Sequence, residues 1–321
     1  MSPSEEQLKS IERRWSSIGS VRTLENIAHK NQTFPILEFR IGSTTPSDPA
    51  LMITGGIHGL ERIGTDVALS FMETIIGRWE WDRSLRHALD QIQLIVIPLV
   101  NPVGHAQFTR SNGNGVDLMR NAPVTAKQAS FAVGGHHWSR RLPWYRGNPE
   151  QTEAGMEPES RALVNSVRGV LKEASFTLAL DLHSGFGIQD QIWYPYAFSQ
   201  DPLPSIDQVK IFEDLLRKAL PNHVYKVEPQ SLHYTTHGDL WDFLYLGHER
   251  KNFLPLTLEM GSWSWVRKNP LQLFSLLGPF NPIKLHRHRR TLRRHLPLFQ
   301  FLMSLTGSPA CMPETDRQKP Q

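Results

Sequence analysis

The segment ALMITGGIHGLER, residues 50–62, joins a short apolar run to two glycines and then to His58 and Glu61, which stand three positions apart. The run ALMIT has the length and composition of a short buried strand. Glycines on both sides of His58 let the backbone come close to a ligand. The segment therefore allows two interpretations, a turn that carries a histidine or half of a metal site.

Outward from this segment, strand and helix patterns alternate along the chain, with no internal repeat and no obvious linker. This order of βα units favours one α/β domain over residues 1–305, with a mixed, mostly parallel central sheet flanked by helices. Residues 306–321 are predicted to form a flexible tail. Strands are predicted at TFPILEFRI (33–41), ALMIT (50–54), IQLIVIPLV (92–100), FTLALDLHSG (176–185) and LPLTLEMG (254–261), and amphipathic helices at 68–76, 157–174, 206–219 and 285–299.

Composition limits the class of protein. With 321 residues, 39% of them hydrophobic, the chain can bury a substantial core. Its single cysteine, Cys311, cannot form an intramolecular disulfide. The first residues lack the apolar core of a secretory signal, and no apolar run reaches membrane-spanning length. We therefore expect a cytoplasmic protein with no membrane partner.

Much of the basic charge lies in one run, HRHRRTLRRH at residues 286–295. A basic run can bind nucleic acid. Here it falls within a helical pattern that places Leu285, Leu292 and Leu296 on one side, which favours the solvated face of an amphipathic helix. No nucleic-acid partner is therefore expected.

Three of the predicted strands end in residues that can bind a metal or move a proton. His58 and Glu61 follow the first of these strands, while His183 ends the second and Glu259 the third. In open α/β sheets, ligands bind beyond the carboxyl ends of the strands. Histidine and carboxylate ligands with one open position make up a catalytic zinc site. The alternative is a set of hydrogen-bonded polar residues at strand ends.

Six segments, in order, resemble motifs of the zinc carboxypeptidase (metallocarboxypeptidase) family. They cover residues 50–262, and six ordered motifs are far more specific than any one of them. The segments are GGIHGLER (55–62), NPVGHAQFTRSNGNGVDLMRN (101–121), YRGNPEQTEAGMEPESRAL (145–163), DLHSG (181–185), GDLWDFLY (238–245) and LTLEMG (256–261).

The resemblance implies a zinc-dependent hydrolase of a peptide or amide bond, acting on a small peptide or an acylated amino acid. Seven functional residues of the family have counterparts here. The resemblance implies zinc ligands at His58, Glu61 and His183, a general base at Glu259, a carbonyl-polarising arginine at Arg110, a carboxylate-binding arginine at Arg120 and a capping tyrosine at Tyr245.

One residue departs from the family pattern. Met119 stands in GVDLMRN where the family has an asparagine that helps the next arginine hold the terminal carboxylate. A thioether cannot donate a hydrogen bond, so carboxylate recognition is expected to be weakened while the zinc centre is untouched. This leaves open a carboxypeptidase that uses Arg120 alone and a zinc deacylase or amidase of the aspartoacylase type. A non-catalytic binding protein on the same fold is a further alternative, which the retained Glu259 and Arg110 disfavour.

A second departure is the aromatic and basic segment FAVGGHHWSRRLPWY, residues 131–145. It is either a surface loop with aromatic side chains packed against the body, or a rim over the cleft that favours acidic or aromatic substrates. The neighbouring His136 and His137 have diverging side chains in most backbones, so we expect no second metal site there.

Overall fold

The computed structural model describes residues 3–131, 133–148, 152–248 and 252–308. One mixed sheet of eight strands forms its centre, in the order β1-β2-β4-β3-β5-β8-β6-β7. The four central strands, β4, β3, β5 and β8, are parallel, while β2 joins β4 and β6 joins β8 in antiparallel fashion. The strands are β1 (Ser20–His29), β2 (Gln32–Gly42), β3 (Ala50–Gly55), β4 (Gln93–Ile97), β5 (Thr177–Ser184), β6 (Gln191–Tyr194), β7 (Lys226–Pro229) and β8 (Phe253–Met260).

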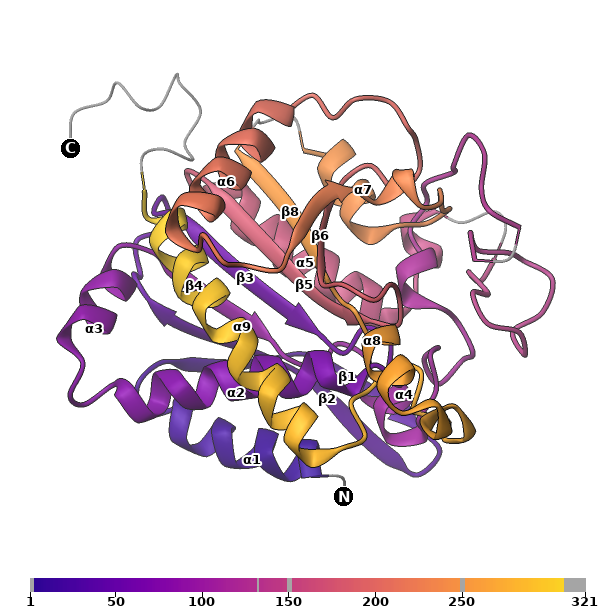
Figure 1. The fold of residues 1–321 in the computed structure, drawn as a ribbon, viewed down its shortest axis with the longest axis horizontal. Coiled ribbons are helices and arrows are strands. Elements are labelled where there is room, and N and C mark those ends of the chain that lie inside the picture. Colours follow the sequence, from indigo (N-terminus) through magenta and orange to yellow (C-terminus); the bar gives the residue numbers. More distant parts are fainter. Residues whose placement is uncertain (1–2, 132, 149–151, 249–251, 309–321) are drawn as a thin grey trace.

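Helices cover both faces of this sheet, which confirms the predicted α/β class (Figure 1). One apolar core lies between the sheet and the helices α1, α2, α3, α6 and α9. A second core lies on the opposite face, beneath α5 and α7. The α-helices are α1 (Pro3–Trp15), α2 (Arg62–Arg78), α3 (Arg83–Asp90), α4 (Pro102–Gln107), α5 (Pro158–Glu173), α6 (Ile206–Ala219), α7 (Leu240–Leu246), α8 (Trp263–Lys268) and α9 (Leu285–Thr306).

Three predicted elements have other boundaries in the structure. The helix expected at 68–76 is α2, which begins six residues earlier, at Arg62. The strand expected at 92–100 ends at Ile97, because Pro98 has no N–H to donate to a sheet ladder and the chain then turns toward β3, where Val100 donates to the Gly55 carbonyl. Thr306, expected to begin the flexible tail, is instead the fully buried last residue of α9. The remainder of that tail, from residue 309, lies outside the described residues.

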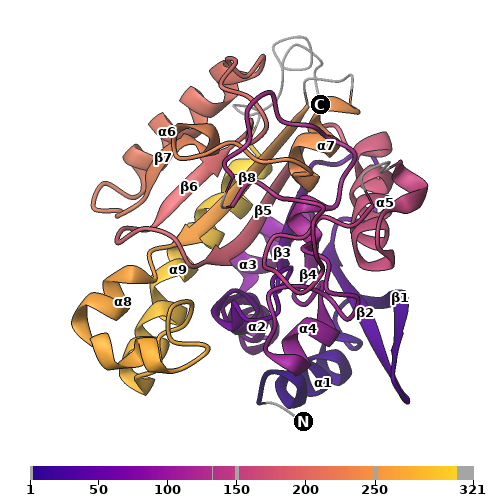
Figure 2. The same ribbon diagram turned by 90° about the vertical axis from the view of Figure 1, so that its right-hand side faces the viewer.

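The parallel order of β3, β5 and β8 brings their carboxyl ends to one edge of the sheet (Figure 2). In the register of β5 and β8, His183 stands directly beside Glu259. The strand β3 is the other neighbour of β5, and its end leads into the loop that carries His58 and Glu61. The three polar strand ends predicted from the sequence therefore meet.

A search for membrane-spanning helices among the described residues finds no helix that is both long and apolar enough. The cytoplasmic location stays a prediction.

Candidate functional site

The loop after β3 is held against its neighbours by close backbone packing. A Cβ atom at Gly59 would lie 2.0 Å from the carbonyl carbon of Gly104, which lies in the first turn of α4. Only glycine fits this approach, and the Asn101 side chain adds a hydrogen bond to the Ile57 carbonyl. His58 is therefore held in a fixed place beside the end of β5.

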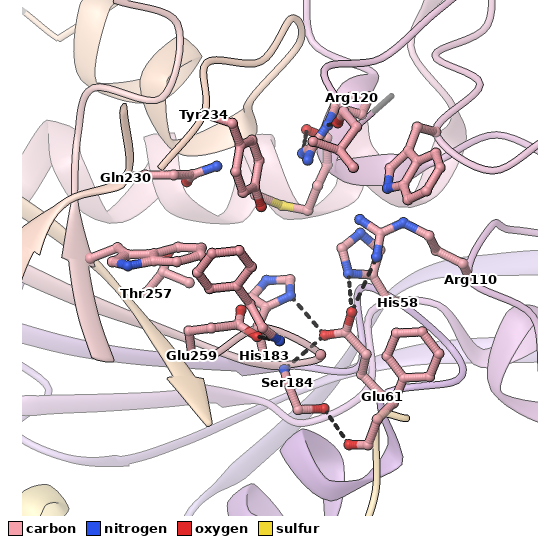
Figure 3. Close-up of a pocket in the computed structure, with 17 residues that line it drawn as sticks. His58, Glu61, Arg110, Arg120, His183, Ser184, Gln230, Tyr234, Thr257 and Glu259 are labelled. Atoms are coloured by element: carbon pink, nitrogen blue, oxygen red, sulfur yellow. Dashed lines mark hydrogen bonds and ion pairs between the residues drawn. The ribbon is translucent and has the colours of Figure 1, made fainter. Parts of the chain in front are cut away.

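The two histidines and Glu61 converge on one point (Figure 3). The Glu61 carboxylate lies between them, 2.9 Å from Nδ1 of His58 and 3.1 Å from Nδ1 of His183. One ligand atom from each residue lies within 4.8 Å of the others, and all three side chains are buried. The backbone N–H of Ser184 also donates to Glu61, which fixes the carboxylate in the loop.

The outer nitrogen of each histidine faces a further carboxylate. Nε2 of His58 lies 3.0 Å from Asp117, and Nε2 of His183 lies 2.6 Å from Asp181. Metal-binding histidines usually donate their second N–H to such a group, which sets the tautomer and the ring orientation. Both Nδ1 atoms are thus directed inward, and the two-histidine, one-glutamate set with an open side fits zinc.

Two glutamates of this cleft have opposite electrostatic environments. Burial alone would raise the pKa of Glu61, but the nearby His58 and His183 outweigh it and hold that pKa well below the usual value. Burial and the negative charge of Glu61 raise the pKa of Glu259 to about 8. Pairs of carboxyl groups with diverging pKa values are typical of acid–base sites. Glu61 suits a permanently ionised ligand, and Glu259 suits a group that takes up and releases a proton.

The pocket around the triad also contains the two predicted arginines and Met119. Arg110 donates to Asp117 at 2.9 Å and to Glu61 at 3.2 Å, so its guanidinium borders the metal site. Arg120 is almost fully buried, and it donates to the carbonyls of Met119 and Val133. The structure therefore brings every predicted site residue except Tyr245 to one pocket.

Tyr245 lies elsewhere. It is in the last turn of α7, where its hydroxyl bonds the Ser205 hydroxyl at 2.7 Å and its ring packs against Tyr196. Tyr234, from the loop before α7, lines the pocket instead (Figure 3). The prediction placed the tyrosine by a short motif, whereas the position of a loop residue depends on the path of the loop. Tyr234 is the tyrosine that can face a substrate.

The aromatic and basic segment 131–145 reaches the pocket only in part. Val133 and Trp144 line it, and the Arg110 guanidinium lies 6.0 Å from the Trp144 ring centre. Trp138 and the arginines at 140 and 141 are exposed. Among the described residues, the only cluster of histidine, cysteine and acidic side chains suited to a metal is the triad itself.

Comparison with known families decides the relationship. Residues 8–266, well over half of the chain, match the model of the zinc carboxypeptidase family. This chain belongs to the zinc carboxypeptidase family. The six motifs lie inside the matched range, and the zinc expected from them is the metal of this family.

Curated relatives in the zinc carboxypeptidase family are longer proteins. The catalytic chain of carboxypeptidase N from Rattus norvegicus is 24% identical over 284 residues, covering 76% of this chain and 58% of that protein. An inactive metallocarboxypeptidase of Saccharomyces cerevisiae is 25% identical over 206 residues, covering 58% of this chain and 45% of that protein. The chain thus spans about half the length of the curated relatives it matches. Since one relative is named inactive, family membership and catalysis are separate questions.

Solved structures of zinc carboxypeptidases share the fold. Bovine thrombin-activatable fibrinolysis inhibitor, solved with a tick carboxypeptidase inhibitor, superposes with a TM-score of 0.66 at 16% identity, over 94% of this chain and 95% of that chain. Carboxypeptidase A from Helicoverpa armigera gives a TM-score of 0.59 at 17% identity, over 91% and 71% of the two chains. These likenesses confirm the α/β architecture with its mixed central sheet.

Several residues of the site were not predicted from the sequence. Asp117 and Asp181, which bond the histidines behind the pocket, lay inside the quoted motifs, and Asp181 could have been found because residues two apart on a strand share a face. Trp193, Gln230 and Tyr234 line the pocket, but they belong to no motif that was recognised. Their contribution depends on how the segment after β5 folds back over the cleft.

Removal of one histidine tests the metal site. We expect His183→Ala to lose stoichiometric zinc on dialysis, because the two remaining ligands cannot hold the ion tightly. Zinc content per chain is measured by atomic absorption. The control is His295→Ala, which removes an equally buried histidine that bonds Tyr225 and lies outside the pocket. Stoichiometric zinc in dialysed His183→Ala would show that the ligand assignment is wrong.

Proposed function

We propose that this chain is a zinc-dependent carboxypeptidase that hydrolyses the last peptide bond of a small peptide. The observation that carries the proposal is the placing of a buried cation, Arg120, in the same pocket as the triad and Glu259. A buried guanidinium that faces a cleft is suited to a carboxylate, which it can bind through two parallel hydrogen bonds. A peptide held by its terminal carboxylate presents its last amide bond to the metal site.

The chemistry needs few groups besides the triad. When bound, zinc lowers the pKa of its water to about 7 and polarises a carbonyl. Glu259 is the proposed general base, since it lies in the pocket beside the triad, where a carboxylate can accept a proton and later pass it to the leaving amine. Arg110 is the proposed cation for the negative charge that develops on the carbonyl oxygen.

Uncharged walls surround the rest of the pocket. Phe186 and Trp193 pack edge to face with ring centres 5.3 Å apart, and Thr257 opens into the pocket from the otherwise buried strand β8. Gln230 adds a neutral amide. These walls favour a C-terminal residue with an uncharged side chain, because a charged group would lose its hydration without a partner of opposite charge.

Met119 supports a second candidate, a zinc amidase or deacylase. Its thioether lines the pocket with Arg120, so position 119 supplies no amide to help the arginine bind an anion. A methionine in place of the family's asparagine would weaken the binding of a peptide with a free carboxylate more than the binding of a substrate with a neutral group at this point. The two candidates differ in how they treat a peptide and its C-terminal amide.

Substitution of the general base separates an enzyme from a binding protein. We expect Glu259→Gln to keep its zinc and fold and to lower kcat by about 10² or more. Glu159→Gln, at a buried carboxyl outside the pocket, serves as the matched control. Turnover and zinc content are measured together. A near-normal rate in Glu259→Gln would assign the base role to another group.

The two tyrosines can be compared directly. We expect Tyr234→Phe to raise KM for a blocked dipeptide about three- to tenfold, as for the loss of one hydrogen bond to the substrate. Tyr245→Phe removes a hydroxyl bonded to Ser205, far from the pocket, and should leave KM unchanged. A larger increase in KM for Tyr245→Phe than for Tyr234→Phe would support the role at Tyr245 that was expected from the sequence.

Restoring the amide tests the substrate class. We expect Met119→Asn to raise kcat/KM about tenfold or more for a peptide with a free C-terminus, because a hydrogen bond to a charged group contributes roughly 1.5 to 3 kcal/mol. The C-terminal amide of the same peptide is the control, and its kcat/KM should not change. The wild-type protein could cleave the free peptide and its C-terminal amide equally well, with neither rate changed by Met119→Asn. That result would favour the amidase over the carboxypeptidase.

A further inference from the structure

A lobe beside the active site is the part of the structure that the proposed function does not use. The lobe consists of residues 263–285, with α8, the 3-10 helix η4 (Pro270–Phe274) and the turns that lead to α9. Figure 2 shows it projecting from the body beside the end of β8. The side chain of Gln272 is buried inside it and donates to the Gly278 carbonyl, which closes the 270s into a tight loop.

The lobe exposes an unusual amount of apolar surface. Seven of the fifteen large apolar side chains exposed among the described residues lie in these 23 positions. Phe274 is 90% exposed, and Leu271 and Leu276 on the same loop are 73% and 69% exposed. Concentrated exposed apolar residues mark an interaction surface. The seven are Trp263, Leu271, Leu273, Phe274, Leu276, Ile283 and Leu285.

Along the segment of the sequence that contains the lobe and α9, the charged side chains have one sign. Residues 260–313 contain eight of the 35 lysines and arginines and none of the 31 acidic residues. The remainder of the chain then has 27 basic and 31 acidic residues, a net charge of −4. Exposed Arg289, Arg290 and Arg293 on the first turns of α9 form no ion pair with the described residues. The apolar lobe is therefore bordered by unpaired positive charge on an otherwise acidic protein.

We propose that the lobe and the first turns of α9 attach this protein to the surface of an anionic membrane. Apolar side chains on a projecting loop can enter the boundary of the acyl chains, while basic residues behind them lie among phosphate groups. Nucleic acid would use the basic residues but leave the exposed leucines and Phe274 in water. The proposal replaces the expectation that the protein has no membrane partner. It requires only binding to the membrane surface, and no helix among the described residues could span a membrane.

Attachment at this point would place the catalytic pocket close to the lipid. Phe280, within the lobe, lines the pocket, and the Trp263 indole donates to the Gly185 carbonyl just after His183. Asn281 bonds the backbone at Leu60 and Ile63, on either side of Glu61. The lobe is thus fastened to the two loops that carry the triad, although membrane binding itself requires no catalysis.

Vesicle cosedimentation tests the proposal without an activity assay. We expect the wild-type protein to bind phosphatidylcholine vesicles that contain about one-third phosphatidylglycerol, and to bind pure phosphatidylcholine and high-salt samples much more weakly. Phe274→Glu/Leu276→Glu should weaken binding about tenfold or more by removing the inserted side chains. Arg289→Glu/Arg293→Glu should weaken it by a similar factor through charge reversal.

Two matched controls lie away from the lobe. Trp81→Glu/Leu246→Glu removes exposed apolar side chains, and Arg161→Glu/Lys172→Glu reverses two charges on α5, across the sheet from α9. Both should bind as the wild type does, and all variants should keep their zinc and thermal unfolding temperature. No vesicle binding by the wild type overturns the proposal, as does binding that the lobe variants leave unchanged. Self-association abolished by the lobe variants, without vesicle binding, would assign the surface to a second copy of the chain.

Discussion

The carboxylate of Glu61, shared by a histidine from the loop after β3 and a histidine from β5, is the interaction on which the rest of the site depends. Each of its oxygens faces one Nδ1, so the loop after β3 and the end of β5 are joined through a single buried side chain. An ionised buried carboxylate is unfavourable unless it is paired and hydrogen-bonded. The buried charge therefore requires the partners that face it, which are His58, His183, the Ser184 N–H and the Arg110 guanidinium.

That requirement explains the layers of polar residues around the triad. Asp117 and Asp181 hold the outer nitrogens of the histidines, and Asp181 in turn accepts from Thr54 and from the Trp241 indole. Polar networks of this kind are stabilising when each member has its partners and costly when one is missing. The side chains of His58, Glu61 and His183 are consequently held in orientation by their neighbours, as a metal site requires.

The pocket and the apolar lobe lie side by side at the edge of the sheet where β3, β5 and β8 end. The pocket has a buried cation and uncharged walls, which suit a small peptide held by one end. The adjoining lobe exposes apolar side chains, and the first turns of α9 beside it expose arginines. This pairing suits the proposed anionic membrane surface. Both are built on the loops that leave β3, β5 and β8 and on the segment after β8, so the parallel strand order decides where each surface lies.

The sequence by itself determined the strands β2, β3, β4, β5 and β8, the α/β class and six of the seven pocket residues expected from the family motifs. These features are readable because they rest on local spacing: His58 and Glu61 belong to one loop, and His183 and Glu259 end apolar strands. Only the tertiary structure decided which tyrosine reaches the pocket. The loop that carries Tyr234 leads to Gly238, where a Cβ atom would lie 1.9 Å from the Arg120 carbonyl oxygen, and that close approach is a contact between distant segments. The apolar lobe was likewise beyond local patterns, because the exposure of Phe274 is not set by its neighbours in sequence. Burial is a property of the folded chain. The same leucines and phenylalanines would be core residues if another helix or strand covered them.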